Sequence, residues 1–309
     1  MGLKIIFMGT PVFAVPILSS ISESKHQILE VFTQPPAKKG RGHKISLSPI
    51  HEFADQLKIK VRHPETIDDE KIIKDIIKLN PDIIVVVAYG KILPKRLLKL
   101  KQIKFINIHA SLLPKWRGAA PIQRAIMNQD NETGISIMKI KPKLDTGPVM
   151  MSSKITITKD MNYNMLSNQL SLLGSKMIIK SLELIEKKIE KFLPQNESEA
   201  TYAKKISKSE AKISWNEQAN KIVAKINALC VNPGSWFNCK GARIKPIKAI
   251  EIKAKGNPGE VLDDDFTIAC SENAVQILEL KKEGKQSMLA KEFLKGNNLK
   301  VGSNINNND

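Results

Sequence analysis

The sequence predicts a doubly wound, Rossmann-like α/β domain followed by a smaller β-barrel domain. In the first domain, short apolar runs alternate with amphipathic segments of helical spacing, as in a sheet covered by helices. The pattern then changes to short runs broken by Gly and Pro, which is typical of a small barrel. At 309 residues the chain is long enough for two cores. We expect a first domain at 1–190, a linker at 191–206 and a second domain at 207–309.

Several of the expected strands are continuous apolar runs, as in strands buried on both faces. The expected strands are Lys4–Met8, Ile28–Thr33, Ile83–Ala88, Phe105–His109 and Ile135–Ile140. The helices expected between and after them are Val12–Ile21, Pro49–Gln56, Asp68–Leu79, Ala119–Met127 and the long Met165–Ile189. A charged segment interrupted by Pro194 follows and reads as the linker, and a helix at Asn216–Leu229 should precede the barrel.

The net charge of +18 favours anionic partners such as nucleic acid, anionic lipid or phosphorylated substrates. Most of the excess lies in residues 1–206, which hold 33 Lys and Arg against 19 Asp and Glu. Lys greatly outnumbers Arg, so a compositional bias like that of AT-rich genomes is an alternative source of part of the charge.

Composition argues against membrane, disulfide and metal-site classes. The longest aliphatic run outside the N-terminus, Ile83–Ala88, is far shorter than the roughly 20 residues of a membrane span. The apolar N-terminus has no basic segment before it and is interrupted by Gly9-Thr10-Pro11, so we expect a first strand there and not a signal peptide. The three cysteines are widely spaced and form no CxxC pair, which predicts no zinc site, no other metal and a reducing, cytoplasmic location.

The most informative stretch is residues 105–123, FINIHASLLPKWRGAAPIQ. Residues two apart in a strand share a face, so Asn107 and His109 should point the same way. They end a predicted buried strand, and open α/β sheets bind ligands at the carboxyl ends of their strands. The alternative is a polar pair that merely satisfies itself at a strand end.

A second piece, Leu144-Asp145-Thr146-Gly147, is by itself a common turn sequence. Together with Asn107 and His109, however, Asp145 resembles the constellation of the formyltetrahydrofolate-dependent formyltransferases. The segments MGTPVFAVPIL, VVVAYGKILP and HASLLPKWRGAAPIQ occur in this order and are similar to the methionyl-tRNA branch of that family.

The resemblance implies an enzyme that moves the formyl group of 10-formyltetrahydrofolate to the α-amino group of methionine on initiator methionyl-tRNA, for translation initiation. It implies that Asn107 and His109 donate to the oxygen of the tetrahedral intermediate, and that His109 moves protons while Asp145 holds its ring. No protein nucleophile and no metal is needed, and we expect a monomer.

The resemblance also implies binding residues. The folate segment would be Ser111, Leu112, Leu113 and Pro114, with Ala88, Tyr89 and Gly90 lining the same pocket; ordinary loop packing is the alternative. The stretch Thr33–Lys44 carries four positive charges within seven residues, and its Pro and Gly predict no regular structure. It resembles a loop that enters the acceptor end of the tRNA, with Arg41 at its centre and Lys38 and Lys39 beside it, and its alternative is a solvated basic loop.

One segment departs from the family pattern. Residues 139–143 read KIKPK where relatives usually carry acidic residues and glycine. The change either alters the shape of the Asp145 loop or helps to bind tRNA.

Two rival functions stay open from the sequence. The first is a formyltransferase for a small acceptor, a glycinamide ribonucleotide or an amino sugar, against which the basic loop and the second domain speak. The second is a nucleic-acid-binding module without catalysis, against which the intact Asn107, His109 and Asp145 speak. The second domain resembles the OB-like β-barrel that binds tRNA in the same branch, and a pure scaffold is the alternative.

Overall fold

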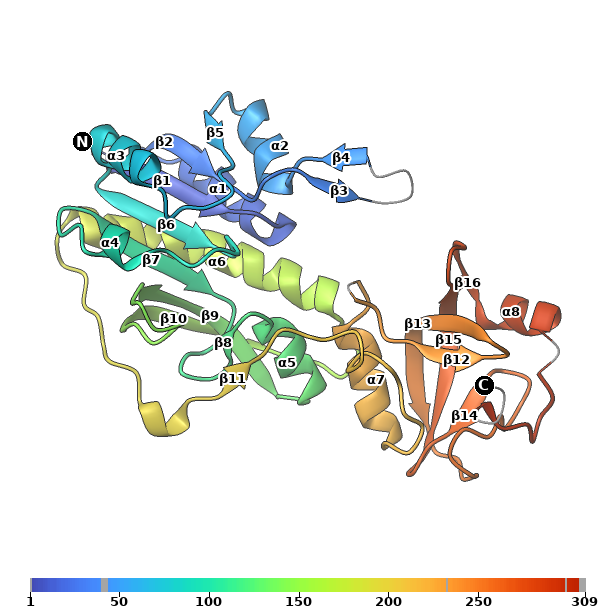
Figure 1. Ribbon diagram of the computed structural model, residues 1–309. Coiled ribbons are helices and arrows are strands. Elements are labelled where there is room, and N and C mark those ends of the chain that lie inside the picture. Colours follow the sequence, from blue (N-terminus) through green and yellow to red (C-terminus); the bar gives the residue numbers. More distant parts are fainter. Residues whose placement is uncertain (1, 40–43, 232, 298, 306–309) are drawn as a thin grey trace. The chain divides into compact units, whose positions relative to one another are not determined.

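The computed structural model describes residues 2–39, 44–231, 233–297 and 299–305, and these pack as two compact units (Figure 1). Unit 1 comprises Met1–Gly118, Thr133–Ile155 and Ser167–Tyr202. Unit 2 comprises Ala119–Glu132, Thr156–Leu166 and Ala203–Asp309. The chain therefore passes between the units more than once.

Unit 1 is built on a seven-stranded sheet in the described part of the chain, in the order β10-β9-β7-β6-β1-β2-β5. The strands are β1 Lys4–Gly9, β2 Gln27–Phe32, β5 Val61–Arg62, β6 Ile83–Val87, β7 Lys104–His109, β9 Glu132–Lys139 and β10 Val149–Thr156. Strands β1, β2, β5, β6 and β7 pair in parallel, whereas β9 is antiparallel to β7. This parallel-dominated sheet confirms the predicted Rossmann-like domain.

The helices of unit 1 begin and end where local chemistry favours it. They are η1 Val12–Ala14, α1 Val15–Ser22, α2 Pro49–Gln56, α3 Glu70–Leu79, α4 Lys95–Leu98, α6 Tyr163–Glu186 and η2 Glu197–Glu199. The start of α6, up to Leu166, belongs to unit 2. The side chain of Ser48 accepts from the His51 N–H and caps α2. The side chain of Asp69 likewise accepts from the Ile72 N–H and caps α3. Asn80 ends α3 in the left-handed conformation. The predicted helices are confirmed, with ends shifted by a few residues.

Unit 1 contains elements that were not expected from the sequence, among them the two-residue strand β5 and the short helix α4. Strand β10 at the sheet edge was not expected, because polar residues interrupt its apolar pattern. The basic stretch was predicted to have no regular structure, and this was wrong for its flanks: β3 Ala37–Lys39 pairs antiparallel with β4 Lys44–Ser46. Pro and Gly prevent strand pairing only where they stand, and the three residues on either side are free of both.

Unit 2 contains a curled antiparallel sheet. The strands of this sheet are β12 Phe237–Cys239, β13 Ala242–Ile252, β14 Thr267–Ala269, β15 Ala274–Lys282 and β16 Ser287–Leu289. The helices of unit 2 are α5 Pro121–Met127, α7 Ala219–Ala228 and α8 Ala290–Asn297. The register of β13 against β15 shifts next to Pro246, which has no N–H to donate, and such irregularities help a sheet to curl. Trp215, Phe237, Phe266 and Phe293 lie in its core, in ring contacts of 5.2 to 6.4 Å. The separate curled sheet confirms the predicted second fold.

None of the helices within the described residues is long and apolar enough to cross a membrane. Two-residue strands β8 Arg117–Gly118 and β11 Tyr202–Ala203 pair with each other outside the two main sheets. They join the loop after β7 to the segment after α6 (Figure 1).

Candidate active site

Two polar side chains at the end of β7 share one face of the sheet. Asn107 is half-buried and His109 is 5% exposed. Ile108 between them faces the other side, where a Cβ placed on Gly174 of α6 would lie 3.5 Å from its methyl group. The period of two in β7 therefore separates an apolar face packed on α6 from a polar face at the carboxyl end of the strand.

Asp145 meets both of these side chains from the loop between β9 and β10. Its Oδ1 accepts from Asn107 Nδ2 at 3.5 Å, and its Oδ2 lies 3.7 Å from His109 Nδ1. Oδ2 also accepts from the backbone N–H of Gly118 at 2.9 Å. Residues 38 apart in the sequence are thus brought together, although nothing in β7 or its neighbours marks Asp145 as their partner.

The orientation of the His109 ring follows from its second contact. Nε2 lies 2.9 Å from the carbonyl oxygen of Trp116, which can only accept, so the proton is on Nε2. Nδ1 then faces the carboxylate of Asp145 at a distance suited to an ion pair when that nitrogen is protonated as well. Both ring nitrogens therefore face acceptors, and the ring is fixed in one orientation.

The loop after β7, Ala110–Gly118, carries the predicted folate segment. Ser111 is fully buried, and its Oγ donates to the Lys115 carbonyl at 2.5 Å. The hydroxyl of Ser136 donates to Ser111 O at 2.8 Å, accepts from Leu113 N at 3.1 Å and lies 3.0 Å from Ser152 Oγ. The half-buried residues Leu112, Leu113 and Pro114 are therefore supported from beneath by serines of β9 and β10, which no motif in the sequence marks as functional.

The second predicted binding stretch follows β6, the neighbour of β7. Ala88 and Gly90 are exposed, but Tyr89 is 1% exposed and packs in the core of unit 1. Burial raises the pKa of Tyr89 to about 12. Its carbonyl accepts from Thr10 Oγ1 at 2.9 Å and from Gln34 Nε2 at 3.0 Å, so two residues that sequence reasoning missed hold this turn in place.

The remaining predicted residues are only partly described. Lys38 and Lys39 belong to β3, and Arg41 lies outside the described residues. Lys143, in the segment that departs from the family pattern, helps to lower the pKa of Glu197, although the larger cause is the hydrogen bond from Arg117. Among the described residues, no group of three or more His, Cys, Asp or Glu side chains is placed to hold a metal.

Comparison with known proteins decides the family. Residues 3–182 match the formyl transferase domain, and residues 205–298 match the formyl transferase C-terminal domain. The chain belongs to the formyl transferase family. The match at residues 3–182 contains β7, the Asp145 loop and the serines of β9 and β10. The candidate active site of this formyl transferase therefore lies within the region that matches the formyl transferase domain.

Individual relatives agree with this assignment. A protein named methionyl-tRNA formyltransferase from Pelagibacter ubique (strain HTCC1062) is 47% identical over 98% of this chain and 99% of its own. A crystal structure of HypX from Aquifex aeolicus in complex with tetrahydrofolic acid is 18% identical, with a TM-score of 0.68 over 97% of this chain and 48% of that one. The methionyl-tRNA formyltransferase from Clostridium thermocellum is 17% identical, with a TM-score of 0.57 over 82% and 95%. The two structures show the shared fold.

Proposed function

We propose that this enzyme transfers the formyl group of 10-formyltetrahydrofolate to the α-amino group of methionine on initiator methionyl-tRNA, the step that prepares this tRNA for translation initiation. The observation that carries the proposal is the 47% identity to a methionyl-tRNA formyltransferase across both domains. The meeting of Asn107, His109 and Asp145 at the end of β7 supports it, because acyl transfer to an amine needs such donors.

The proposed chemistry needs only these side chains. The amine nitrogen attacks the formyl carbon, a tetrahedral centre with a negative oxygen forms, and the bond to the folate nitrogen breaks as that nitrogen gains a proton. Asn107 donates to the negative oxygen, and His109 moves the proton, with Asp145 holding its ring. A substrate atom that takes the Nε2 proton replaces the carbonyl of Trp116 as its partner.

We propose that the folate co-substrate lies between the two stretches at the carboxyl ends of β6 and β7. Leu112, Leu113 and Pro114 offer apolar contact for a flat ring, while exposed backbone at Ala88 and Gly90 offers hydrogen bonds. Ser111 and Tyr89 support these stretches from the interior, since both are buried.

We propose a catalytic domain at 1–190, a linker at 191–206 and a tRNA-binding domain at 207–309. The basic loop with Lys38, Lys39 and Arg41 would bind the acceptor end of the tRNA. Protection of Lys38, Lys39 and Arg41 from trypsin by tRNA would support this role, and equal cleavage with and without tRNA would contradict it.

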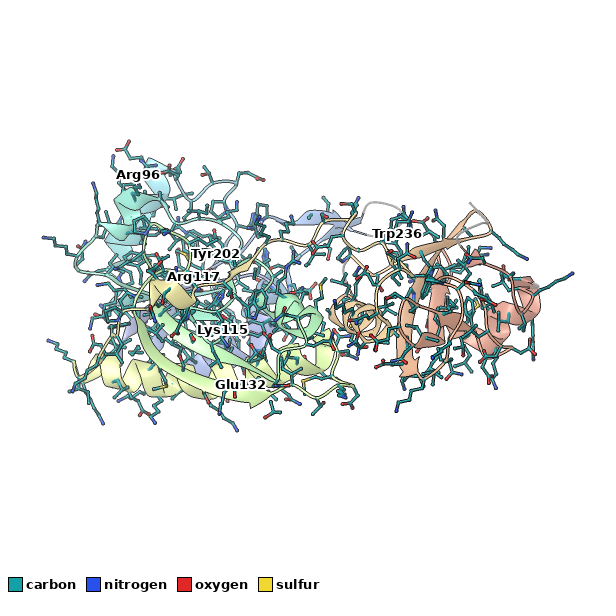
Figure 2. The ribbon with its side chains drawn as sticks, turned by 90° about the horizontal axis from the view of Figure 1, so that it is seen from below. Arg96, Lys115, Arg117, Glu132, Tyr202 and Trp236 are labelled. Carbon is teal, nitrogen blue, oxygen red and sulfur yellow. The ribbon has the colours of Figure 1, made fainter. Side chains whose placement is uncertain are left out.

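A second surface suited to nucleic acid lies in unit 2. The Arg243 guanidinium lies 4.1 Å from the ring centroid of Trp236, which is labelled in Figure 2, so an aromatic and a basic group lie together there.

We propose that the enzyme acts as a monomer in the cytoplasm. One chain supplies all three proposed catalytic side chains, and its cysteines are free thiols within the described residues, as a reducing compartment maintains them.

A single assay tests the function. The purified enzyme receives 10-formyltetrahydrofolate with charged initiator tRNA, glycinamide ribonucleotide or a nucleotide-linked amino sugar, and the formylated product is identified. We expect only the tRNA to be formylated. The same result is expected when the enzyme has been dialysed against EDTA and Mg²⁺ is added back for the tRNA. Formylation of a small acceptor instead, or dependence on a transition metal, would overturn the proposal.

A further inference from the structure

The segment Leu193–Tyr202, here called the strap, follows α6 and hydrogen-bonds both the Asp145 loop and the loop after β7. At its start, Leu193 and Val149 exchange two backbone hydrogen bonds of 2.8 Å. At its end, Tyr202 belongs to β11, which pairs with β8 at Arg117 and Gly118, and Figure 2 labels Arg117 and Tyr202. Neither of the two regions that match the family domains, 3–182 and 205–298, contains the strap.

Within the strap, Gln195 holds the loop that carries Asp145. Its Nε2 donates to the carbonyl of Asp145 at 2.8 Å and to that of Gly147 at 2.6 Å. Both amide hydrogens are therefore used on this one turn, in which Asp145 has a φ of 51°. A residue other than glycine rarely adopts this conformation unless its surroundings hold it there.

Arg117 in turn fixes the Gln195 amide. Its Nε and Nη2 donate to Gln195 Oε1 at 3.0 and 2.8 Å, which determines which end of the amide faces the Asp145 loop. Its Nη1 and Nη2 donate to Glu197 of the strap at 3.0 and 2.7 Å. Arg117 is 1% exposed, and a buried guanidinium requires such partners, so this arrangement is strongly specified.

The strap also holds the loop that carries the acceptor for His109. Thr201 Oγ1 accepts from Trp116 N at 2.8 Å, and Thr201 O accepts from Arg117 N at 2.9 Å. The Trp116 carbonyl, on the same residue, is the partner of His109 Nε2. One segment thus contacts the backbone of both residues that orient the His109 ring.

We propose that Gln195 is a positioning residue for formyl transfer. Held by Arg117, its amide fixes the backbone of Asp145 so that the carboxylate stays against His109 and Asn107. The inference rests on the proposed function, because it assigns Gln195 an effect on the reaction through Asp145. A purely structural role would instead give lower stability without a specific effect on turnover.

The decisive variant is Gln195→Glu. It keeps the size of the side chain and the oxygen that accepts from Arg117. It replaces the donating Nε2 by an oxygen, which cannot donate to the carbonyls of Asp145 and Gly147. We expect kcat to fall roughly 10- to 100-fold, because small displacements of catalytic groups have effects of this size. The KM values for folate and tRNA should change less than about threefold, since ground-state binding is retained. Gln56→Glu, the same change at an exposed position of α2, is the control and should match the wild type.

A double-mutant cycle with Asp145→Asn tests the route of the effect. If Gln195 acts through Asp145, Gln195→Glu should lower kcat by less than about threefold in the Asp145→Asn background. Independent, additive losses would overturn the inference. So would a wild-type kcat in a folded Gln195→Glu variant. Absence of methionyl-tRNA formylation by the wild-type enzyme would instead remove the proposed function, so the two failures are distinguishable.

Hydrogen exchange gives a readout that does not depend on activity. Amides of residues 140–148 should exchange faster in Gln195→Glu than in the wild type, and not in Gln56→Glu. If the Glu variant fails to fold, Gln195→Met removes the same hydrogen bonds without adding charge and should show the same loss of kcat and the same faster exchange. Unchanged exchange in this loop would contradict the inference.

Discussion

The two loops that border the candidate active site are held in different ways. The first, Ala110–Gly118, rests at Ser111 and Leu113 on a serine hydroxyl of β9, which in turn contacts a serine of β10, and its end at Trp116 and Arg117 hydrogen-bonds Thr201 of the strap. The second, between β9 and β10, is held by Gln195, a residue 50 positions from Asp145 that belongs to no strand of that sheet. The sheet therefore determines the position of His109, whereas the position of Asp145 also depends on chain that follows α6.

The largest expected effect comes from replacing the three proposed catalytic side chains themselves. His109→Ala, Asn107→Ala and Asp145→Ala should each lower kcat at least ~10²-fold, because each removes a donor or its support in the transition state. Circular dichroism should show an unchanged fold. A well-folded variant with near-normal formylation would remove that residue from the mechanism.

A smaller effect is expected when the second loop is distorted from within. A Cβ on Gly147 would lie 1.6 Å from the carbonyl oxygen of Lys139, so the backbone of this loop must shift in Gly147→Ala. We expect turnover to fall at least roughly tenfold, since the shift displaces Asp145. Gly296→Ala is the control, because nothing lies within 4 Å of its added methyl group. Equal activity of the two variants would contradict the dependence of Asp145 on this loop.

The matching change in the first loop is Ser136→Ala. It leaves the Leu113 N–H without its partner in the interior, which should lower the free energy of unfolding by about 1–3 kcal/mol. We expect a higher KM for folate with kcat changed by only a few-fold, as measured by steady-state kinetics and chemical denaturation. Ser271→Ala, at an exposed position of unit 2, should leave both quantities unchanged. A normal KM for folate would show that this support does not shape the folate segment.

The smallest effect concerns pH. The hydrogen bond from Arg117 lowers the pKa of Glu197 in the folded state. Its stabilising effect is therefore complete above the unfolded pKa of about 4.3 and is lost as the pH falls through the lower folded value. Tm should consequently fall less steeply below about pH 4.3 in Glu197→Gln than in the wild type. The difference should be small because the Glu197 side chain is 60% exposed, and parallel curves would show that the pair contributes nothing.

Local patterns were enough to predict the sheet of unit 1 and its main helices. Strand β6 reads IIVVV and is buried at every position, and α2 begins with a capping serine and a proline. Strand β10 escaped prediction because a half-exposed edge strand with polar residues has no clear apolar period.

In the candidate active site, too, local patterns predicted some residues and missed those whose contacts are distant in the sequence. Asn107 and His109 were found from their spacing in one strand, and Asp145 only through the resemblance to a family. Gln195 could not be found from the sequence, because a glutamine in a charged segment has no distinguishing pattern and its partners lie about 50 residues away. The burial of Tyr89 was missed for a related reason, since its environment is made by helices and strands distant in sequence.

The path of the strap has a consequence for protein engineering. A fragment or chimera cut at residue 190, where the catalytic domain is proposed to end, would remove Gln195, Glu197 and Thr201 and leave Arg117 buried without the carboxylate and amide that pair with it. A cut after Tyr202 keeps these contacts within unit 1. Exchange of second domains between related enzymes should therefore carry the strap with the catalytic partner, so that each hybrid inherits an active site assembled from a single parent.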